Sequence, residues 1–430
     1  MKYLLTRLNN PFFNRLALCA LLASGAFIIL LWSPNVLGRH INHEGKIIIY
    51  IFPWIMIWLV YSQKAVTLKA LRPEIILIVL IIVVGVVNTA LSDSVSRSIP
   101  QMRTFLLTGI LALWAAMFLF TGEHRRRIFD WFCAVCLAII VPVELIVRAR
   151  QGAHGPETFS VFTLNPIPLG TLIILLSSGL LALLLSPYLR SKVAGGLLTS
   201  LSGALIIITT KRGTLMALAA MLLGWMLLRG GRLRYLAGAV LLVVGLAVVT
   251  QGPSLVRRLN PDIPSQYTIL HRLELYPFAL HIWRIHPIMG IGLRPYTQQQ
   301  YLADYHQHIK KLKRFPEAVA QLQTFDNMLL TDFVELGTVM TLLYLVLIML
   351  IVVKYYRTLR SAPGAMAMDW YRLITILGFA VNSMIYDSLL FPPVNWLFHV
   401  QLGIMAGYYV AARAPVPAPA EAGLQLESAI

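Results

Sequence analysis

The chain has 430 residues, of which 58% are hydrophobic and only 13% are charged, and its formal net charge is +18 at pH 7. Its mean hydropathy of +0.73 excludes an ordinary soluble protein, because such a chain has too few polar residues to cover a surface in water. We therefore predict an all-α polytopic membrane protein.

Most of the apolar segments, taken in chain order, reach the roughly 17 to 25 residues that a helix needs to cross a bilayer. They predict about twelve transmembrane helices. Their approximate bounds are 14–32, 46–63, 74–91, 102–120, 128–147, 166–186, 193–210, 213–229, 235–250, 327–353, 371–390 and 394–412. Trp32, Ser33 and Pro34 follow the first segment in place of a small-residue cleavage site, so we interpret that segment as a retained span.

This pattern divides the chain into four parts. Residues 1–250 hold the first nine spans, and residues 251–326 form a polar loop domain with its own apolar helix pattern. Residues 327–412 hold the last three spans, and residues 413–430 form a Pro/Ala-rich tail that we expect to be disordered. The loop domain is strongly basic, which indicates a site for an anionic ligand.

Lys and Arg residues outside the loop domain fall mainly on one side of the predicted spans. That side is the one that carries the N-terminus, and the positive-inside rule therefore places both chain ends in the cytoplasm. Lys211 and Arg212 break the rule, because they lie in a tight turn on the opposite side.

The turn at Lys211 and Arg212 has two interpretations. Both side chains can extend along the helices to reach the lipid headgroups. Alternatively, the turn captures a phosphate, since Arg212 presents a planar fork of donors and the amides around Gly213 open the next helix.

Residues 268–286 of the loop domain are predicted to form an amphipathic helix, which ends at Pro287. His281 and Arg284 lie close together on its polar face, and Arg272 lies near its start. This face is either a simple solvated surface or part of the anion site.

The rest of the loop domain carries further basic residues. His306, His308, Lys310 and Lys311 form a cluster that is either a solvated helix face or a contact for a phosphorylated acceptor, and Arg294 lies upstream of it. We take these five residues as acceptor-binding candidates.

Two aspartates lie at the edges of the last spans. Asp326 begins the re-entry into the membrane, where it is either a helix N-cap or a general base that activates the attacking group. Asp387 lies near the outer end of the next span, and ionisable residues at such depth usually have a function.

Several short motifs of the second half belong together. They are Thr209-Thr210-Lys211-Arg212-Gly213, His271-Arg272, His286-Pro287-Ile288-Met289-Gly290-Ile291-Gly292, and Asp326-Asn327 followed by Gly337. Jointly they resemble the O-antigen ligase and polymerase superfamily, over roughly Ile208 to Gly337.

The resemblance implies a membrane glycosyltransferase of the GT-C type in the bacterial inner membrane, with a periplasmic loop domain over the active site. Its donor would be a glycan on undecaprenyl pyrophosphate, and its acceptor would be lipid A-core. By the same resemblance, the pyrophosphate would be held by Arg212 together with Arg272 or Arg284, and Lys211 would lie beside Arg212. Asp387 matches an acidic residue of the ligases.

One position departs from the ligase pattern. Ligases carry His before the Asn of the last motif, and this chain carries Asp326, a form associated with polymerases and other relatives. A polymerase that extends a lipid-linked glycan is therefore the alternative. The predicted catalytic residues are Asp326, Arg212, Arg284, Asp387 and His281.

Arginines can stabilise the charge that builds on a departing pyrophosphate, as a metal otherwise might. The chain lacks an Asp-x-Asp pair, and Cys133 and Cys136 lie within an apolar segment as small packing residues do. We therefore expect inverting transfer without a metal or other cofactor, membrane lipids as neighbours and no nucleic acid partner. A lipid-linked oligosaccharide transporter is a second alternative, although its charges would be expected near the membrane midplane.

Overall fold

The computed structural model describes much of the chain, and every regular element among the described residues is a helix. The described residues are 11–31, 69–151, 160–163, 166–208, 212–229, 238, 269–293, 325, 327–362, 366–389 and 391–413. The elements of the first half are α2 (Pro11–Ala26), η1 (Phe27–Leu31), α5 (Arg72–Ala90), α6 (Val95–Thr104), η3 (Phe105–Ile110), α7 (Leu111–Leu119), α8 (Glu123–Gln151), α9 (Pro166–Leu176), α10 (Ser178–Leu184) and α11 (Leu189–Ile208). Those of the second half are α12 (Arg212–Arg229), α15 (Ile269–Ile285), α18 (Met328–Glu335), α19 (Gly337–Ser361), α20 (Ala367–Ser383) and α21 (Pro392–Arg413).

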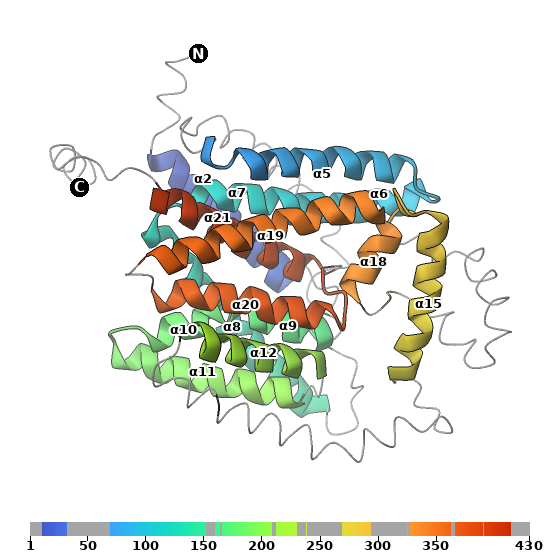
Figure 1. Cartoon of the computed structure of the whole chain (residues 1–430). Coiled ribbons are helices and arrows are strands. Elements are labelled where there is room, and N and C mark those ends of the chain that lie inside the picture. Colours follow the sequence, from blue (N-terminus) through green and yellow to red (C-terminus); the bar gives the residue numbers. More distant parts are fainter. Residues whose placement is uncertain are drawn as a thin grey trace.

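Most of the long helices lie side by side in one bundle, and α15 crosses one end of it (Figure 1). We call this end the α15 end. At the opposite end, Glu74 near the start of α5 accepts hydrogen bonds from Lys354 of α19 and Tyr409 of α21, at 2.6 and 2.7 Å. These contacts fix the relative positions of three helices at this end of the bundle.

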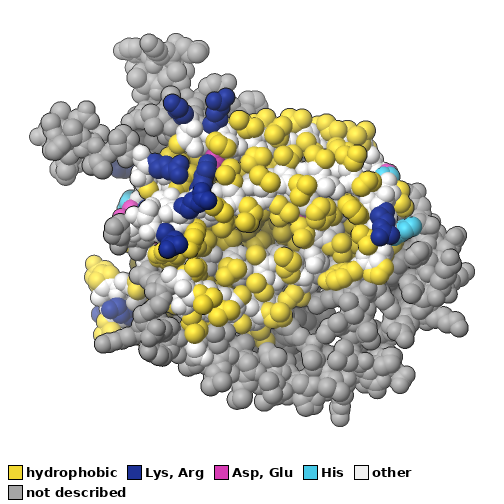
Figure 2. Space-filling view, in the orientation of Figure 1, with side chains coloured by type: hydrophobic (Ala, Val, Ile, Leu, Met, Phe, Trp, Pro, Cys, Tyr) yellow, Lys and Arg dark blue, Asp and Glu magenta, His cyan; other side chains and the backbone are white. Residues whose placement is uncertain are grey.

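Four helices of the described residues are long and apolar enough to cross a membrane. They are Arg72–Ala90, Val95–Leu119, Glu123–Arg150 and Gly337–Ser361. Figure 2 shows a broad apolar surface with basic side chains at its two ends. The exposed apolar side chains of α5 and α19 include Val83, Val86, Val346 and Met349, each of which is more than half exposed. Exposed apolar side chains in a continuous belt are what a lipid bilayer requires, which supports a multi-pass membrane protein.

The predicted bounds agree with several helices and differ from others. The amphipathic helix predicted over 268–286 is confirmed by α15. The predicted spans 46–63 and 235–250 lie outside the described residues, apart from Gly238. The span predicted over 327–353 is divided into two helices, α18 and α19. In the span predicted over 371–390, the helix α20 stops at Ser383, so the last residues of that span are not helical.

The helix α21 forms the centre of the bundle. Trp396 and Leu397 are at most 1% exposed, and Gly403 allows close packing because a Cβ there would lie 2.6 Å from the carbonyl oxygen of Leu113 in α7. Two of its amide groups bond neighbouring helices, since Nδ2 of Asn395 donates to Oγ1 of Thr108 at 3.0 Å and Nε2 of Gln401 donates to the carbonyl oxygen of Leu175 at 3.2 Å. Small residues and hydrogen bonds between helices are how helices associate in a membrane, where apolar burial alone gives little preference.

Candidate functional site

Two short segments meet backbone to backbone at the α15 end. One is Pro287–Leu293, which follows α15, and the other is Val334–Val339, where α18 ends and α19 begins. We call the two together the glycine clasp. The amides of Ile291 and Gly292 donate to the carbonyl oxygens of Val334 and Glu335, at 3.0 and 2.9 Å. These carbonyls end α18 and would otherwise lack helical partners.

The clasp is reciprocal. The amides of Thr338 and Val339, which open α19, donate to the carbonyl oxygens of Pro287 and Ile288 at 2.9 and 3.3 Å. Each segment therefore satisfies the free helix-terminal groups of the other. This exchange explains why one predicted span is interrupted where it is.

Three glycines make this close approach possible. Gly290, Gly292 and Gly337 have φ values of +67°, +88° and +74°, which other residues rarely adopt. A Cβ on Gly290 would lie 2.5 Å from the carbonyl oxygen of Glu335, and one on Gly337 would overlap the carbonyl oxygen of Ile288. The His286–Gly292 motif is therefore a docking turn, which is more than the simple helix stop expected from the sequence.

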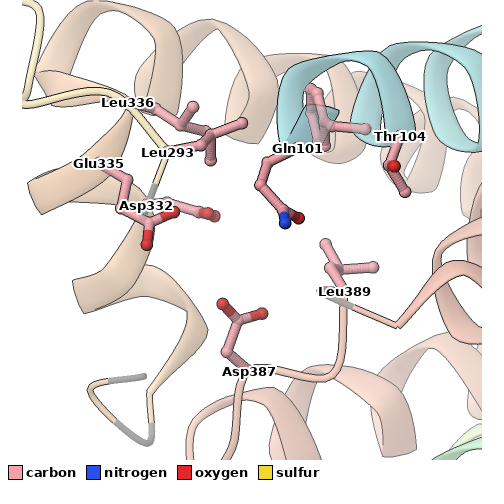
Figure 3. A pocket seen from close by; sticks show the side chains of 9 residues that line it. Gln101, Thr104, Leu293, Asp332, Glu335, Leu336, Asp387 and Leu389 are labelled. Carbon is pink, nitrogen blue, oxygen red and sulfur yellow. The ribbon is translucent and has the colours of Figure 1, made fainter. Parts of the chain in front are cut away.

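A small pocket lies directly beside the clasp, with a volume of about 30 Å³, room for about two water molecules. It is lined by Gln101, Thr104 and Phe105 from the α6–η3 span, Leu293 from the clasp, Asp332, Glu335 and Leu336 from α18 and its end, and Asp387 and Leu389 from the segment after α20. Figure 3 shows the carboxyl groups of Asp332, Glu335 and Asp387 and the amide of Gln101 around one space. We call this the carboxylate pocket.

The carboxylate pocket gathers three acidic side chains into a largely buried place. Glu335 and Asp387 are 1% and 2% exposed, while Asp332 is partly exposed. Ionised carboxyl groups that lie this close together repel one another, and carboxylate oxygens accept hydrogen bonds from hydroxyl groups such as those of a sugar.

The helix α18 is held in place by the residue before it. The side chain of Asn327 accepts from the amide of Leu330 at 3.0 Å and so caps α18, and its Nδ2 donates to the carbonyl oxygen of Met384 at 3.2 Å. The N-cap that the sequence offered as one role of Asp326 therefore belongs to Asn327. Asp326 itself lies outside the described residues.

The sequence predicted that Asp387 lies within a transmembrane helix. This prediction is wrong, because α20 ends at Ser383. Asp387 lies in the irregular segment that follows. The next residue, Ser388, joins a buried network in which Nδ2 of Asn382 donates to Oγ1 of Thr171 at 2.6 Å and to Oγ of Ser388 at 3.2 Å. This network ties the segment of Asp387 to α9.

The start of α12 packs against the same region. A Cβ on Gly213 would lie 2.9 Å from Oδ1 of Asn382, and one on Gly170 of α9 would overlap the side chain of Thr214. Arg212 is the first residue of α12. Its backbone therefore lies next to the end of α20, at the same end of the bundle as Asp387.

The helix α15 contributes two of the predicted site residues with described side chains. Phe278 and Ile282 are buried against Phe325 and Val334, in a small apolar cluster separate from the main core. His281 is partly exposed and Arg284 is exposed, and neither lines the carboxylate pocket. Arg272 also lies on α15.

The remaining predicted site residues lie outside the described residues. They are Lys211, Arg294, His306, His308, Lys310 and Lys311. Their proposed roles in binding the donor or the acceptor stay predictions.

Two lining residues of the pocket were not recognised as candidates in the sequence, although a signal was present. Asp332 and Glu335 are three residues apart in a segment interpreted as one apolar span. Two carboxylates at helical spacing within a span should indicate either a helix break or a polar cavity. The structure has both.

Comparison with known protein families places part of the chain within a described family. Residues 197–345 match the family model described as O-Antigen ligase. The matched range includes the second half of α11, all of α12, α15, the glycine clasp and the pocket-lining helix α18. It confirms the resemblance predicted from the sequence motifs. No curated protein matches the chain.

Proposed function

We propose that this chain, which carries the O-antigen ligase family match, is a membrane glycosyltransferase of the GT-C type with about twelve spans. It moves a glycan from undecaprenyl pyrophosphate to lipid A-core at the periplasmic face of the bacterial inner membrane. The α15 end of the bundle is then the periplasmic end. The observation that carries the proposal is the meeting of the start of α12, the segment of Asp387 and the carboxylate pocket at one end of the bundle.

The proposed donor site uses arginines. Arg212 at the start of α12, together with Lys211 and with Arg272 or Arg284 of α15, binds the pyrophosphate. The first amides of a helix add a partial positive charge that favours phosphate. As the bond to the anomeric carbon breaks, negative charge grows on the leaving oxygen, and these fixed donors stabilise it without a metal or another cofactor.

The proposed acceptor chemistry uses carboxylates. Asp326, assisted by His281 or Asp387, removes the proton from the attacking hydroxyl or orients that hydroxyl. A single displacement then inverts the anomeric centre. Arg294, His306, His308, Lys310 and Lys311 contact the phosphates of the lipid A-core acceptor.

A polymerase is the second candidate, and one position favours it. Asp326 occupies the place where ligases carry His, so the attacking hydroxyl could belong to a second lipid-linked glycan. The donor half of the site is the same in both reactions. The two differ only in the acceptor.

The test combines purified protein with a lipid-linked glycan, in the presence of EDTA, and adds either rough lipopolysaccharide or no second acceptor. A ligase gives glycan-bearing lipopolysaccharide only in the first mixture, as read by gel mobility. A polymerase instead lengthens the lipid-linked glycan in both mixtures. Absence of any new glycosidic product, together with movement of the intact donor across proteoliposomes, would identify a transporter and reject both transferase readings.

A further inference from the structure

We propose that Asn88 of α5 is a positioning residue that sets the distance between α15 and α18, and so between the two halves of the proposed site. This inference rests on the proposed function for its catalytic consequence. The contacts that carry it are independent of that function.

Asn88 is an unusual residue for its place. It is 1% exposed, near the end of a helix whose preceding turns are composed almost wholly of Ile, Leu and Val. A buried amide in such a helix is costly unless its polar atoms are paired. The contacts of Asn88 should therefore show why it is there.

The amide group of Asn88 reaches both segments of the glycine clasp. Its Nδ2 donates to the carbonyl oxygen of Met289 and, at 3.2 Å, to the carbonyl oxygen of Glu335. Its Oδ1 has no hydrogen-bond partner among the described residues. Both acceptors are carbonyl oxygens, so only the NH₂ group can face them, and it uses both of its hydrogens.

The two carbonyl groups belong to the two chain segments that form the glycine clasp. Met289 lies three residues before Gly292, in the turn after α15, and α15 carries Arg272, His281 and Arg284. Glu335 ends α18 and lines the carboxylate pocket with Asp332. One amide from a third helix therefore holds the predicted phosphate-binding helix and the pocket-lining helix to each other.

Two neighbouring side chains also bond the glycine clasp, but only on the side of the segment after α15. Ser92 and Ser98 donate to the carbonyl oxygens of Ile291 and Leu293, at 3.0 and 3.2 Å, and both bonds go to the segment after α15. Among these three side chains, Asn88 alone also bonds α18. Its loss should loosen the clasp while leaving the segment after α15 attached to the bundle.

The variant that tests this is Asn88→Leu, which keeps a γ-branched side chain with the same number of non-hydrogen atoms and removes both N–H donors. The matched control is Thr89→Val, because Thr89 is the next residue, is 8% exposed, and donates only within α5 to the carbonyl oxygen of Gly85 at 2.8 Å. Hydrogen exchange of the purified proteins reports on the amides of Ile291 and Gly292. We expect exchange there to accelerate about tenfold or more in Asn88→Leu, with α21 and the part of α19 after Val339 unchanged and with Thr89→Val like wild type.

Transfer kinetics supply the second readout. We expect kcat of Asn88→Leu to fall about 10- to 100-fold, the scale of a small misplacement of reacting groups, with little change in KM for the donor. Unchanged exchange at the clasp, or acceleration spread evenly over all helices, would overturn the positioning role. If wild-type protein transfers no glycan, the proposed function fails, while the exchange result still decides whether Asn88 holds the clasp.

Discussion

Arg372 is 1% exposed within α20, and its guanidinium group donates to Asp130 of α8 and to Asp369 of its own helix. The distance from its Nη2 to Oδ2 of Asp130 is 2.5 Å. A buried charge of this kind is tolerated only while its partners are present. Residues such as this one determine stability, whereas those near the carboxylate pocket are better placed to determine chemistry.

Removing one partner of Arg372 should destabilise the protein. We expect Asp130→Ala to lower the free energy of unfolding by about 3 to 5 kcal/mol, because it leaves a buried charge with only Asp369. Thermal unfolding of the purified protein measures this. The control is Glu123→Gln, which breaks an exposed ion pair with Arg127 and should change stability by no more than about 1 kcal/mol. Equal effects of the two variants would show that burial does not matter here.

Arg212 should be sensitive to the shape of its side chain as well as its charge. Lys keeps the charge and loses the two-pronged geometry, so Arg212→Lys should reduce the transfer rate and Arg212→Ala should reduce it more. The loss in Arg212→Ala corresponds to roughly 2 to 4 kcal/mol, or about 30- to 1000-fold in rate. Melting temperatures serve as the folding control. Wild-type transfer by a stable Arg212→Ala protein would favour the alternative, in which this side chain only reaches toward the lipid headgroups.

The helical elements depend on one another at the glycine clasp. The end of α18, the start of α19 and the segment after α15 exchange backbone hydrogen bonds, so none of these helix termini is complete alone. The clasp also gives the carboxylate pocket one of its walls through Leu293. A change in the clasp should therefore be felt in both stability and activity.

Gly337→Ala should disrupt the clasp. The φ value of +74° is strained for Ala, and the added Cβ would overlap the carbonyl oxygen of Ile288. We expect a loss of about 1 to 3 kcal/mol in unfolding free energy, or a larger loss if the backbone cannot shift, together with a fall in transfer rate. The control is Gly203→Ala in α11, where a Cβ meets nothing within 4 Å and where Ala should stabilise the helix slightly. If the two variants have the same melting temperature and the same transfer rate, the glycine clasp does not contribute to stability or activity.

The whole molecule is organised as a bundle whose two ends differ. The end marked by Glu74, Lys354 and Tyr409 is held by side-chain bonds between three helices. The α15 end holds the clasp and the carboxylate pocket. In the proposed orientation the α15 end faces the periplasm, together with the loop domain predicted over 251–326.

Cysteine labelling tests this orientation. Ser265→Cys, in a background with Cys19, Cys133 and Cys136 replaced, should react with a membrane-impermeant maleimide added to spheroplasts. A cysteine at the tail residue Ser428 should react only after the membrane is opened. The reverse pattern would invert the orientation and place the proposed site in the cytoplasm.

Sequence alone was sufficient for the class and for much of the helical layout. Apolar length predicted the helices now seen as α5, α8 and α12, and periodicity predicted α15. Composition determines these features because each helix must satisfy its backbone within itself in a lipid environment. The motifs around Arg212, the His286–Gly292 turn and Gly337 also identified the family now matched over residues 197–345.

Tertiary structure decided which of these motifs meet. Asp332 and Asp387 come from segments about fifty residues apart, and Asn88 bonds residues more than two hundred positions away. No local pattern in the sequence marks such pairs. The break between α18 and α19 likewise follows from hydrogen bonds donated by a distant turn. A helix terminus can form inside an apolar segment only where another part of the chain supplies the missing partners, and that supply is a property of the folded molecule.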